Sequence, residues 1–558
     1  MKSRPNNRRP GDTQGSDIES TEPLRLDLKS FDDMLPHVGD FGFYQWLLLI
    51  SLIPYCFTYS VLYFGQFFIT LVPTTYWCHV DGLGNLTIEE RRNENIPQLL
   101  NADPPYETCH RWNDSSAKEN SSLVSCTTWE YNLTSIPYKS LAAELDWVCD
   151  RSYLVSTAQS IFFCGSIVGG LLFGWLADHK GRIPALVICN GVGLLATVAT
   201  AYANSFWSFA VIRFFAGLAF DNCINIPLII VLEYVAVDKR SLVVNGAFGF
   251  YFALSSTILP WIAYFVADWR ILCYVLAIPF LNAIVTPWIL PESSRWYMTS
   301  GMSEKVVTKL KRIAQFNKKT PDPAIYDAFM ANQEKDDREE QTATVLDLFK
   351  TRRLAKHTIL VTLFWTLTAL AFDGHVYSLK SLSGSVFVSF TLTSATELPA
   401  GILLILVLDR WGRRACSFVP TILTAVCSFL MIFIKTGIAS LVVAVTARFL
   451  LNMAANVALQ YAAEVLPTPA RAQGVALVHI FGIIAHSMAP YVVEMTHIWD
   501  KLPMITLTLV SLVASILVLH LPETMGEDLP QTLQEGEDFC REQNFWSVPC
   551  IKKKSRPV

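Results

Sequence analysis

Long apolar runs alternate with shorter polar connections along this chain. A helix needs about 20 mostly apolar residues to cross a hydrocarbon core of about 30 Å. Six such runs precede the middle of the chain, at 44–71, 154–175, 184–203, 207–232, 242–266 and 272–290. Six more follow a charged interval, at 357–377, 386–408, 417–434, 439–462, 475–493 and 502–519. The pattern predicts an all-α polytopic membrane protein with twelve transmembrane helices in two sets of six.

The composition supports a lipid bilayer as the surrounding medium. Of 558 residues, 52% are hydrophobic and 16% are charged, whereas soluble domains carry about 25% charged residues. The net charge is -4, and no sustained basic face is present to neutralise a phosphate backbone, so nucleic acid is not expected as a partner. The first forty residues are polar and lack the apolar core of a cleaved signal peptide. We therefore expect the N terminus to stay in the cytosol.

Basic residues on the short connections predict the orientation, because Lys and Arg are retained on the cytoplasmic side. They fall on alternate connections, at Lys180, Arg182, Lys239, Arg240, Arg410, Arg413 and Arg414. With twelve spans, both termini are then cytoplasmic. The long first connection, 72–152, faces the exterior of a plasma membrane.

That long connection has the features of an extracellular loop. It carries four Asn-x-Ser/Thr glycosylation sites, at Asn85, Asn113, Asn120 and Asn132. Four of the thirteen cysteines also lie there: Cys78, Cys109, Cys126 and Cys149. An even number of cysteines in an oxidising compartment predicts two disulfides, for which three pairings are possible.

The chain therefore divides into five parts. They are a cytosolic segment at 1–43, a six-helix bundle at 44–291, a cytosolic loop at 292–356, a second bundle at 357–521 and a cytosolic tail at 522–558. Within the cytosolic loop, Val306, Leu310, Ile313 and Phe316 form one apolar stripe at helical spacing. The stripe predicts amphipathic helices under the membrane domain, with a solvated tether as the alternative.

The two bundles share an internal repeat. Asp178-x-x-Gly-Arg182 follows the second span and Asp409-x-x-Gly-Arg413 follows the eighth, and the other matched residues are Glu233 with Glu464, Arg240 with Arg471, and Pro291 with Pro522. Each residue lies 231 positions before its counterpart (409 minus 178, for example), which indicates a duplicated six-helix unit. We interpret these charges as a gating network that latches the cytosolic faces of the bundles and breaks when that side opens. The alternative is that they only anchor topology and cap helices.

These motifs resemble those of a known family. Residues 174–182 and 409–413 resemble the loop signature of the major facilitator superfamily. Residues 37–42, 146–150, 291–296, 461–468 and 521–524 are similar to motifs of solute carrier family 22, the organic cation, carnitine and organic anion transporters. The resemblance covers about 35–532. It implies the major facilitator fold and alternating access around a central cavity, without ATP or another cofactor; the chain also lacks a phosphate-binding P-loop.

Ionisable residues within spans are costly and are therefore candidates for substrate contact. The deep ones are mainly acidic, namely Asp221, Asp373 and Glu397. Trp365 and Phe372 lie seven residues apart, so an aromatic wall beside Asp373 could hold an ammonium group. Packing is the alternative for both rings, and pairing with Arg213 is the alternative for Asp221.

One position departs from the family pattern. In the eleventh span, typical cation transporters have an Asp and typical anion transporters an Arg, where this chain has Ile483. In the fourth span, some cation carriers have a Lys where this chain has Asp221. We therefore expect the negative site to have moved, and the substrates to be small organic cations or zwitterions such as amines, carnitine-like or β-alanine-like solutes. An organic anion exchanger is the alternative within transport, and a transporter-like receptor or binding protein is the alternative of another class.

Two histidines in the eleventh span are candidates for proton coupling. His479 and His486 lie seven residues apart on one face, and histidine changes charge near neutral pH. A structural role is the alternative, and the coupling ion, Na⁺ or H⁺, is left open. A single positive charge gains about 2.3 kcal/mol per 100 mV of membrane potential, so modest uptake needs no other energy source. No catalytic triad or metal-ligand cluster is present in the sequence, and no enzyme activity is predicted.

Overall fold

The computed structural model describes residues 31–543, except 40, 74, 81–86, 88–89, 91, 94–95, 100–105, 114–121, 135, 241, 334–342, 380–384, 435–436, 528 and 542. The predicted glycosylation sites at Asn85 and Asn120 lie outside the described residues. So do the first thirty residues and, in the predicted C-terminal tail, residues 528, 542 and 544–558.

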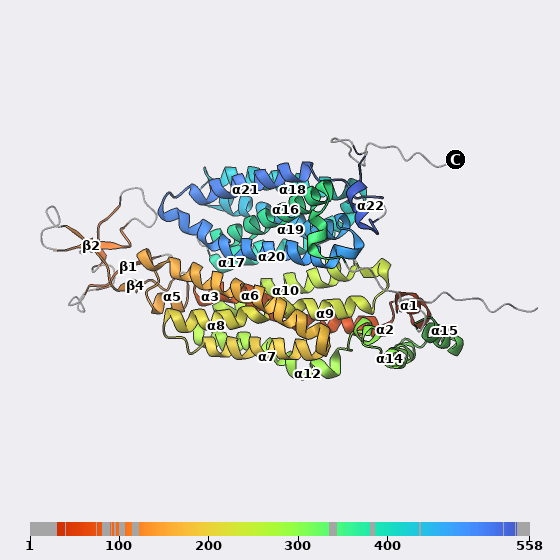
Figure 1. Cartoon of the computed structure of the whole chain (residues 1–558). Coiled ribbons are helices and arrows are strands. Elements are labelled where there is room, and N and C mark those ends of the chain that lie inside the picture. Colours follow the sequence, from red (N-terminus) through yellow and green to blue (C-terminus); the bar gives the residue numbers. More distant parts are fainter. Residues whose placement is uncertain are drawn as a thin grey trace, which may run out of the picture.

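Two helical bundles lie side by side (Figure 1). The N-terminal half contains α2 (Phe43–Ser51), α3 (Ile53–Ile69), α6 (Tyr153–Lys180), α7 (Arg182–Thr200), α8 (Phe206–Ala219), α9 (Asn222–Glu233), a π-helix (Leu242–Phe248), α10 (Gly249–Val266), α11 (Trp269–Ala277), a 3-10 helix (Ile278–Leu281) and α12 (Asn282–Ile289). The C-terminal half contains α16 (Arg352–Ser378), α17 (Val386–Ala395), α18 (Glu397–Met431), α19 (Ile438–Val465), α20 (Thr468–Glu494) and α21 (Leu502–Leu519).

Eleven helical stretches among the described residues are long and apolar enough to cross a membrane. One of them, Val386–Met431, contains both the eighth and the ninth predicted spans. It changes direction at Gly412, whose φ of 82° and ψ of 168° are not helical. Counting this stretch as two helices restores the predicted twelve. Proline marks breaks between other helices, because it has no N–H to continue a helix. Pro54 lies in the first turn of α3, and Pro279 lies in the 3-10 helix between α11 and α12.

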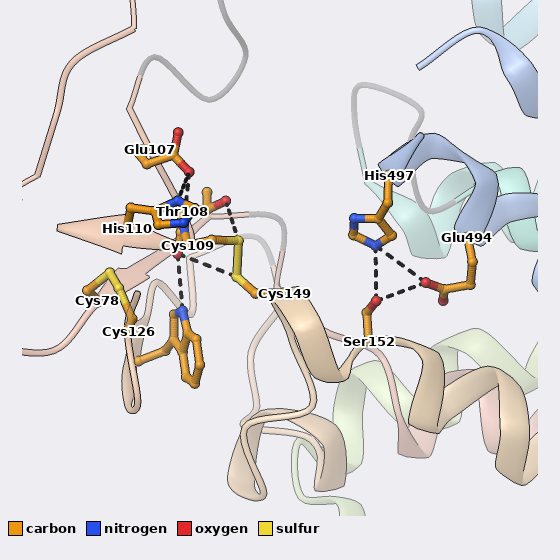
Figure 2. The surroundings of a disulfide bond; sticks show 11 residues. Cys78, Glu107, Thr108, Cys109, His110, Cys126, Cys149, Ser152, Glu494 and His497 are labelled. Carbon is orange, nitrogen blue, oxygen red and sulfur yellow. Dashed lines mark hydrogen bonds and ion pairs between the residues drawn. A yellow bond between two sulfur atoms is a disulfide. The ribbon is translucent and has the colours of Figure 1, made fainter. Parts of the chain in front are cut away.

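The long first connection contains a small β-structured region, which the pattern of apolar runs does not predict. Strand β1 (Tyr76–Cys78) pairs antiparallel with β4 (Trp129–Tyr131), and β2 (His110–Trp112) pairs antiparallel with β3 (Leu123–Ser125). Of the three possible disulfide pairings, the structure has Cys78–Cys126 and Cys109–Cys149 (Figure 2). Asn113 is exposed and Asn132 is half-buried. We call the end of the molecule that carries this region the disulfide end; α5 (Leu141–Glu144) and a 3-10 helix (Cys149–Arg151) connect it to α6.

Short helices gather at the opposite end of the N-terminal half, which we call the loop end (Figure 1). They are α1 (Phe31–Val38), α13 (Ser294–Thr299), α14 (Ser303–Phe316) and α15 (Pro323–Gln333). Val306, Leu310 and Ile313 of α14 are buried, while Phe316 is 44% exposed and packs on Tyr44. The predicted apolar stripe therefore covers the bundle, as an amphipathic helix does. The remaining short elements are two 3-10 helices (Val237–Lys239 and Val345–Phe349), a third after α20 (Met495–His497), and α22 (Leu533–Asp538).

Candidate substrate-binding site

Both copies of the repeated motif form the same tight turn at the loop end. Gly181 and Gly412 have φ of 100° and 82°, a region that favours glycine. A Cβ atom at either glycine would lie within 2.7 Å of a carboxylate oxygen, from Glu292 at Gly181 and from Glu523 at Gly412. These two carboxylates accept hydrogen bonds from the backbone N–H groups that begin the next helix, at 2.8 and 3.1 Å for Glu292 and at 2.9 and 3.0 Å for Glu523. The duplicated motif therefore builds a duplicated helix cap.

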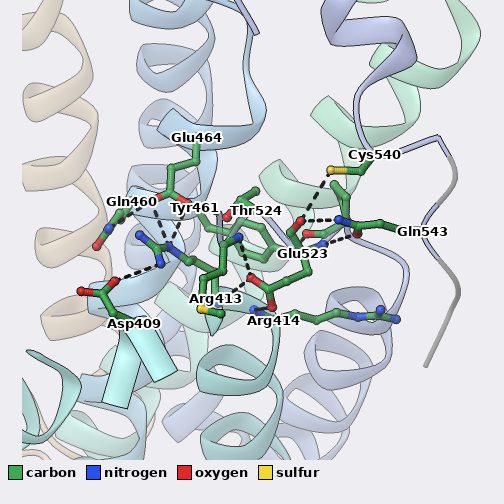
Figure 3. Close-up of polar contacts among 12 residues, drawn as sticks. Asp409, Arg413, Arg414, Gln460, Tyr461, Glu464, Glu523, Thr524, Cys540 and Gln543 are labelled. Atoms are coloured by element: carbon green, nitrogen blue, oxygen red, sulfur yellow. Dashed lines mark hydrogen bonds and ion pairs between the residues drawn. The ribbon is translucent and has the colours of Figure 1, made fainter. Parts of the chain in front are cut away.

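The side chains around each turn repeat as well. Arg182 pairs with Glu233 at 3.1 Å, and Arg413 pairs with Glu464 at 3.0 Å (Figure 3). A hydroxyl donates to each glutamate, from Ser293 to Glu233 at 2.6 Å and from Thr524 to Glu464 at 2.5 Å. Every one of these residues lies 231 positions from its counterpart. The 231-residue offset found in the sequence therefore also relates the side-chain contacts of the two halves.

The predicted gating charges bind within their own halves in this structure. Asp409 reaches Arg413 at 3.2 Å, although its side chain is 82% exposed, and Asp178 is exposed. Arg240 binds Asp32 at 2.5 Å, and Arg471 donates to the carbonyl of Leu466 at 3.0 Å. These contacts thus brace each bundle. They do not form a direct contact from one bundle to the other among the described residues, and their role in switching stays a prediction.

Two of the three predicted acids lie between the halves, and each faces a histidine. Asp221, at the junction of α8 and α9, is 6% exposed; its carboxylate accepts from Ser166 at 2.6 Å and lies 3.2 Å from Nε2 of His479. Asp373, on α16, is 2% exposed, and its carboxylate lies 2.8 Å from Nδ1 of His486. Buried charges need partners, so the two histidines offset the free-energy cost of burying these carboxylates.

Helix α20 supplies both histidines, and Tyr63 of α3 completes the second pair. The Tyr63 hydroxyl donates to Asp373 from the other half of the molecule. The ring of Phe163, on α6, stacks on His486 with centroids 5.6 Å apart. Ile483 lies between the two histidines along α20 and is 3% exposed. The Asp221–His479 pair and the Tyr63–Asp373–His486 cluster therefore both cross the boundary between the bundles; together we call them the central pairs.

Glu397 begins α18 and is half-buried. Its carboxylate accepts from Asn456 of α19 at 3.5 Å, the edge of hydrogen-bond range. This acid is less firmly held than the other two. It lies in the same half as Asp373, and its contact with substrate stays a prediction.

The two predicted aromatic residues lie in different surroundings, so they do not form one wall. Trp365 is 8% exposed in the core of the C-terminal half, where a Cβ atom at Gly482 would lie 2.1 Å from its Nε1. The ring of Phe372 lies 3.4 Å from the guanidinium of Arg448, which also donates to its carbonyl at 2.9 Å. These surroundings favour the packing alternative for Trp365, and Arg448 lies against the ring of Phe372.

Arg213, the alternative partner of Asp221, is engaged elsewhere. It donates to the carbonyl of Leu62 at 3.4 Å and lies 4.5 Å from the ring of Phe162. The aromatic residues near Asp373 are instead Tyr63, Phe163 and Phe220, the last with its ring centroid 5.3 Å from that of Tyr63. The sequence interpretation missed them. The spacing of Tyr59, Tyr63 and Gln66, a polar stripe within an apolar span, is the signal that could have found them.

Helices α6 and α20 hold the two halves together toward the disulfide end. Ser152 donates to the carboxylate of Glu494 at 2.9 Å (Figure 2). Ser156 donates to the same carboxylate at 3.0 Å, and Ser160 donates to the carbonyl of Ser487 at 2.6 Å. Along α20, these contacts follow the two histidines toward the disulfide end. Among the described residues, no group of three or more His, Cys, Asp or Glu side chains is arranged to hold a metal ion.

Comparison with known proteins decides the family. A sequence model of the Major Facilitator Superfamily matches residues 121–490, more than half of the chain. The chain belongs to the Major Facilitator Superfamily. Among solved structures of the superfamily, a proton:xylose symporter has the same fold, with a TM-score of 0.56 at 15% identity over 88% of this chain and 98% of that one.

Curated relatives narrow the resemblance within the Major Facilitator Superfamily. The chain is 29% identical over 552 residues to the carcinine transporter of Drosophila melanogaster, covering 94% of this chain and 81% of that protein. It is also 29% identical over 562 residues to solute carrier family 22 member 3 of Mus musculus, covering 95% and 99%. The resemblance to solute carrier family 22 is confirmed. The chain is a multi-pass membrane transporter and not an enzyme.

Proposed function

We propose that this transporter moves small organic cations or zwitterions, with amines, carnitine-like and β-alanine-like solutes as candidates, across a plasma membrane by alternating access. One observation carries the proposal: Asp221 and Asp373 are buried between the two halves, and their facing bases are histidines. The names of several relatives support it, including carcinine transporter and organic cation transporter protein, both of Drosophila melanogaster.

The orientation follows from the same features that the sequence offered. The disulfide end carries two disulfides and the described glycosylation sites, which suit the exterior. The loop end carries the basic connections, which suit the cytosol. We therefore place the disulfide end outside and both termini in the cytosol.

Charge balance at the central pairs defines the transport cycle that we propose. When His486 is protonated, it neutralises Asp373. When it releases that proton, the carboxylate remains and can hold an ammonium group in its place. The exchange of one ammonium for one proton leaves the charge of the site unchanged, so H⁺ is the coupling ion that we favour over Na⁺. The membrane potential then adds nothing to this step, in contrast to the expectation from the sequence.

Binding at these pairs also affects the contact between the halves. Asp221 and Tyr63 belong to the N-terminal half, whereas His479, His486 and Asp373 belong to the C-terminal half. A substrate that takes the place of the His479 imidazolium at Asp221 weakens a bond across the boundary. A substrate at Asp373 instead competes with the hydrogen bond that Tyr63 donates across the boundary. This gives the two bundles freedom to rock, because a ligand shifts a conformational equilibrium by its differential affinity for the two states.

The other readings have less support. An organic anion exchanger needs free cationic groups in the centre, but Arg213 and Arg448 each lie against a phenylalanine ring and donate to a carbonyl. A static receptor has no use for two intact copies of the loop-end network. Uptake of labelled amines, carnitine, β-alanine and simple carboxylates into expressing cells tests the proposal. We expect uptake of an amine or zwitterion, and uptake of carboxylates alone would overturn it.

A further inference from the structure

A cavity of about 300 Å³ lies directly on the disulfide side of the central pairs. Three of the residues that line it are within about one helical turn of that layer. Gln66 follows Tyr63 on α3, Gln159 precedes Phe163 on α6, and Tyr377 follows Asp373 on α16. All three offsets, of three or four residues, place the cavity nearer the disulfide end. A solute that enters from that end meets this cavity before it meets Asp373.

Two buried polar atoms that line this cavity have no hydrogen-bond partner among the described residues: the acceptor Oε1 of Gln66 and the donor Nε2 of Gln159. Gln66 is 2% exposed, and its Nε2 donates to the carbonyl of Val155 at 3.4 Å. Its Oε1 has no hydrogen-bond partner among the described residues. A buried acceptor without a donor is costly, and native structures avoid it unless water or a ligand supplies the donor. The amide oxygen therefore favours a ligand that carries N–H groups.

The rest of the lining favours positive charge. Glu494 contributes a carboxylate whose side chain is 24% exposed, and His497 lies 3.4 Å from it. Aromatic side chains also line the cavity, from Phe67, Tyr76, Trp147 and Tyr377, and aromatic faces attract cations. No Lys or Arg occurs among the described residues that line it. The cavity thus offers an anion, an unpartnered acceptor from Gln66, an unpartnered donor from Gln159 and aromatic walls.

We propose that this cavity is a second, outer binding site for protonated primary amines, which holds the substrate before the central pairs open. The inference rests on the proposed function for its orientation and substrate class. Gln66 acts as the specificity residue, since its oxygen can accept from an R–NH₃⁺ group but not from a quaternary ammonium, which has no N–H. Glu494 supplies the charge that both kinds of ligand need.

The test measures ligand protection of a cysteine in the cavity. Val493, which lines it, is replaced (Val493→Cys), and its modification by a membrane-impermeant cationic thiol reagent is followed with and without 2-phenylethylamine. The same measurement with the trimethylated analogue of this amine gives the quaternary comparison. Tyr202→Cys, on an exposed connection outside the cavity, is the matched control, and the parent chain controls for native cysteines. We expect the primary amine to protect Val493→Cys and not Tyr202→Cys.

The experiment is done in the Asp373→Asn background, where the Asp373–His486 pair is disabled. Protection there does not depend on the Asp373 carboxylate. Adding Gln66→Leu should raise the half-protecting concentration of the primary amine about 10-fold, the loss of one hydrogen bond to a charged group, and should leave the quaternary analogue unchanged. Glu494→Gln should weaken both, whereas Glu130→Gln, in the β-structured region, should weaken neither.

Two outcomes overturn the inference. If no amine protects Val493→Cys in the Asp373→Asn background, while the parent still takes up amines, the cavity is a water-filled vestibule only and the proposed function survives. If Gln66→Leu affects both amines equally, Gln66 has no role in specificity. Conversely, protection without amine uptake by the parent would count against the proposed function and not against the outer site.

Discussion

The contacts of the internal repeat are the same in both halves at the loop end of the molecule, but they differ between the halves at its centre. At the loop end, both halves make the same contacts, through Arg182, Glu233 and Glu292 in one and Arg413, Glu464 and Glu523 in the other. At the centre, Asp221 faces His479, but the residue 231 positions after Asp221 is the uncharged Asn452. Asn452 is buried and donates to Thr396 at 3.1 Å.

This difference separates two roles of the charged residues, one structural and one in substrate binding. Each half needs the same turn and cap to join its second and third helices, so both copies keep them. A substrate with one positive charge contacts both halves at once. The carboxylates that bind it must therefore surround one ligand, and they need not occur at equivalent positions of the two halves. We infer that the symmetric charges stabilise the bundles and that the asymmetric charges at the central pairs choose the solute.

Removing an asymmetric charge should have the largest effect. Asp373→Asn keeps the shape of the side chain but cannot hold an ammonium by charge. We expect the kcat/KM for amine uptake to fall on the order of 100-fold, which corresponds to about 2.7 kcal/mol. The measurement is initial uptake normalised to surface abundance. Unchanged uptake at equal abundance would remove Asp373 from the site.

Replacing the histidines should change the coupling more than the rate. In His486→Gln and His479→Gln, no imidazole is present to trade its proton for the substrate. We expect the roughly 10-fold change in uptake per pH unit of gradient that one-for-one exchange permits to become smaller in at least one variant. A pH dependence that is identical in both variants and in the parent would contradict the exchange at these pairs.

The two glycines of the repeated turn should behave alike. Gly181→Ala and Gly412→Ala each place a Cβ atom in a conformation that only glycine adopts readily, close to a carboxylate. Each should cost about 1–3 kcal/mol of stability and lower the melting temperature of the purified protein. Gly174→Ala, where an added Cβ meets nothing within 4 Å, is the control. A large loss at one glycine and none at the other would break the symmetry that we describe.

The exposed acids of the repeated motif should matter least. Asp409 is 82% exposed beside Arg413, and exposed ion pairs contribute about 0–1 kcal/mol. Asp409→Asn and Asp178→Asn should each change uptake by less than about twofold. A loss as large as that of Asp373→Asn would mean that these acids act in switching and that the loop end is not only a brace.

The sequence predicted the spans and the repeat well because both rest on local signals. Apolar runs fix span positions, and the 231-residue offset fixes which turns are equivalent. The sequence also named Asp221, Asp373, His479 and His486 as candidate site residues, since ionisable residues in spans are rare, and their role stays a prediction. It did not predict that each acid faces a histidine, because that pairing depends on how α9, α16 and α20 pack together.

Other errors have the same origin. The partner of Phe372 is Arg448, 76 residues away along the chain, and no local pattern connects them. Tyr63 reaches Asp373 across the boundary between the halves. The strands in the first connection are three residues each, too short for an alternation of polar and apolar residues to reveal them.

The most direct test of the central claim is amine flux in liposomes that contain the purified full-length chain. Uptake of the labelled trimethylated analogue of 2-phenylethylamine, which has no neutral form that could cross the bilayer unaided, is measured with the membrane potential clamped at zero and the lumen more acidic than the outside. We expect this cation to accumulate in vesicles that contain the parent chain above its level in vesicles that contain Asp373→Asn, and we expect a clamped negative potential to add little. Accumulation that follows the potential and ignores the proton gradient would contradict exchange at the acid–histidine pairs.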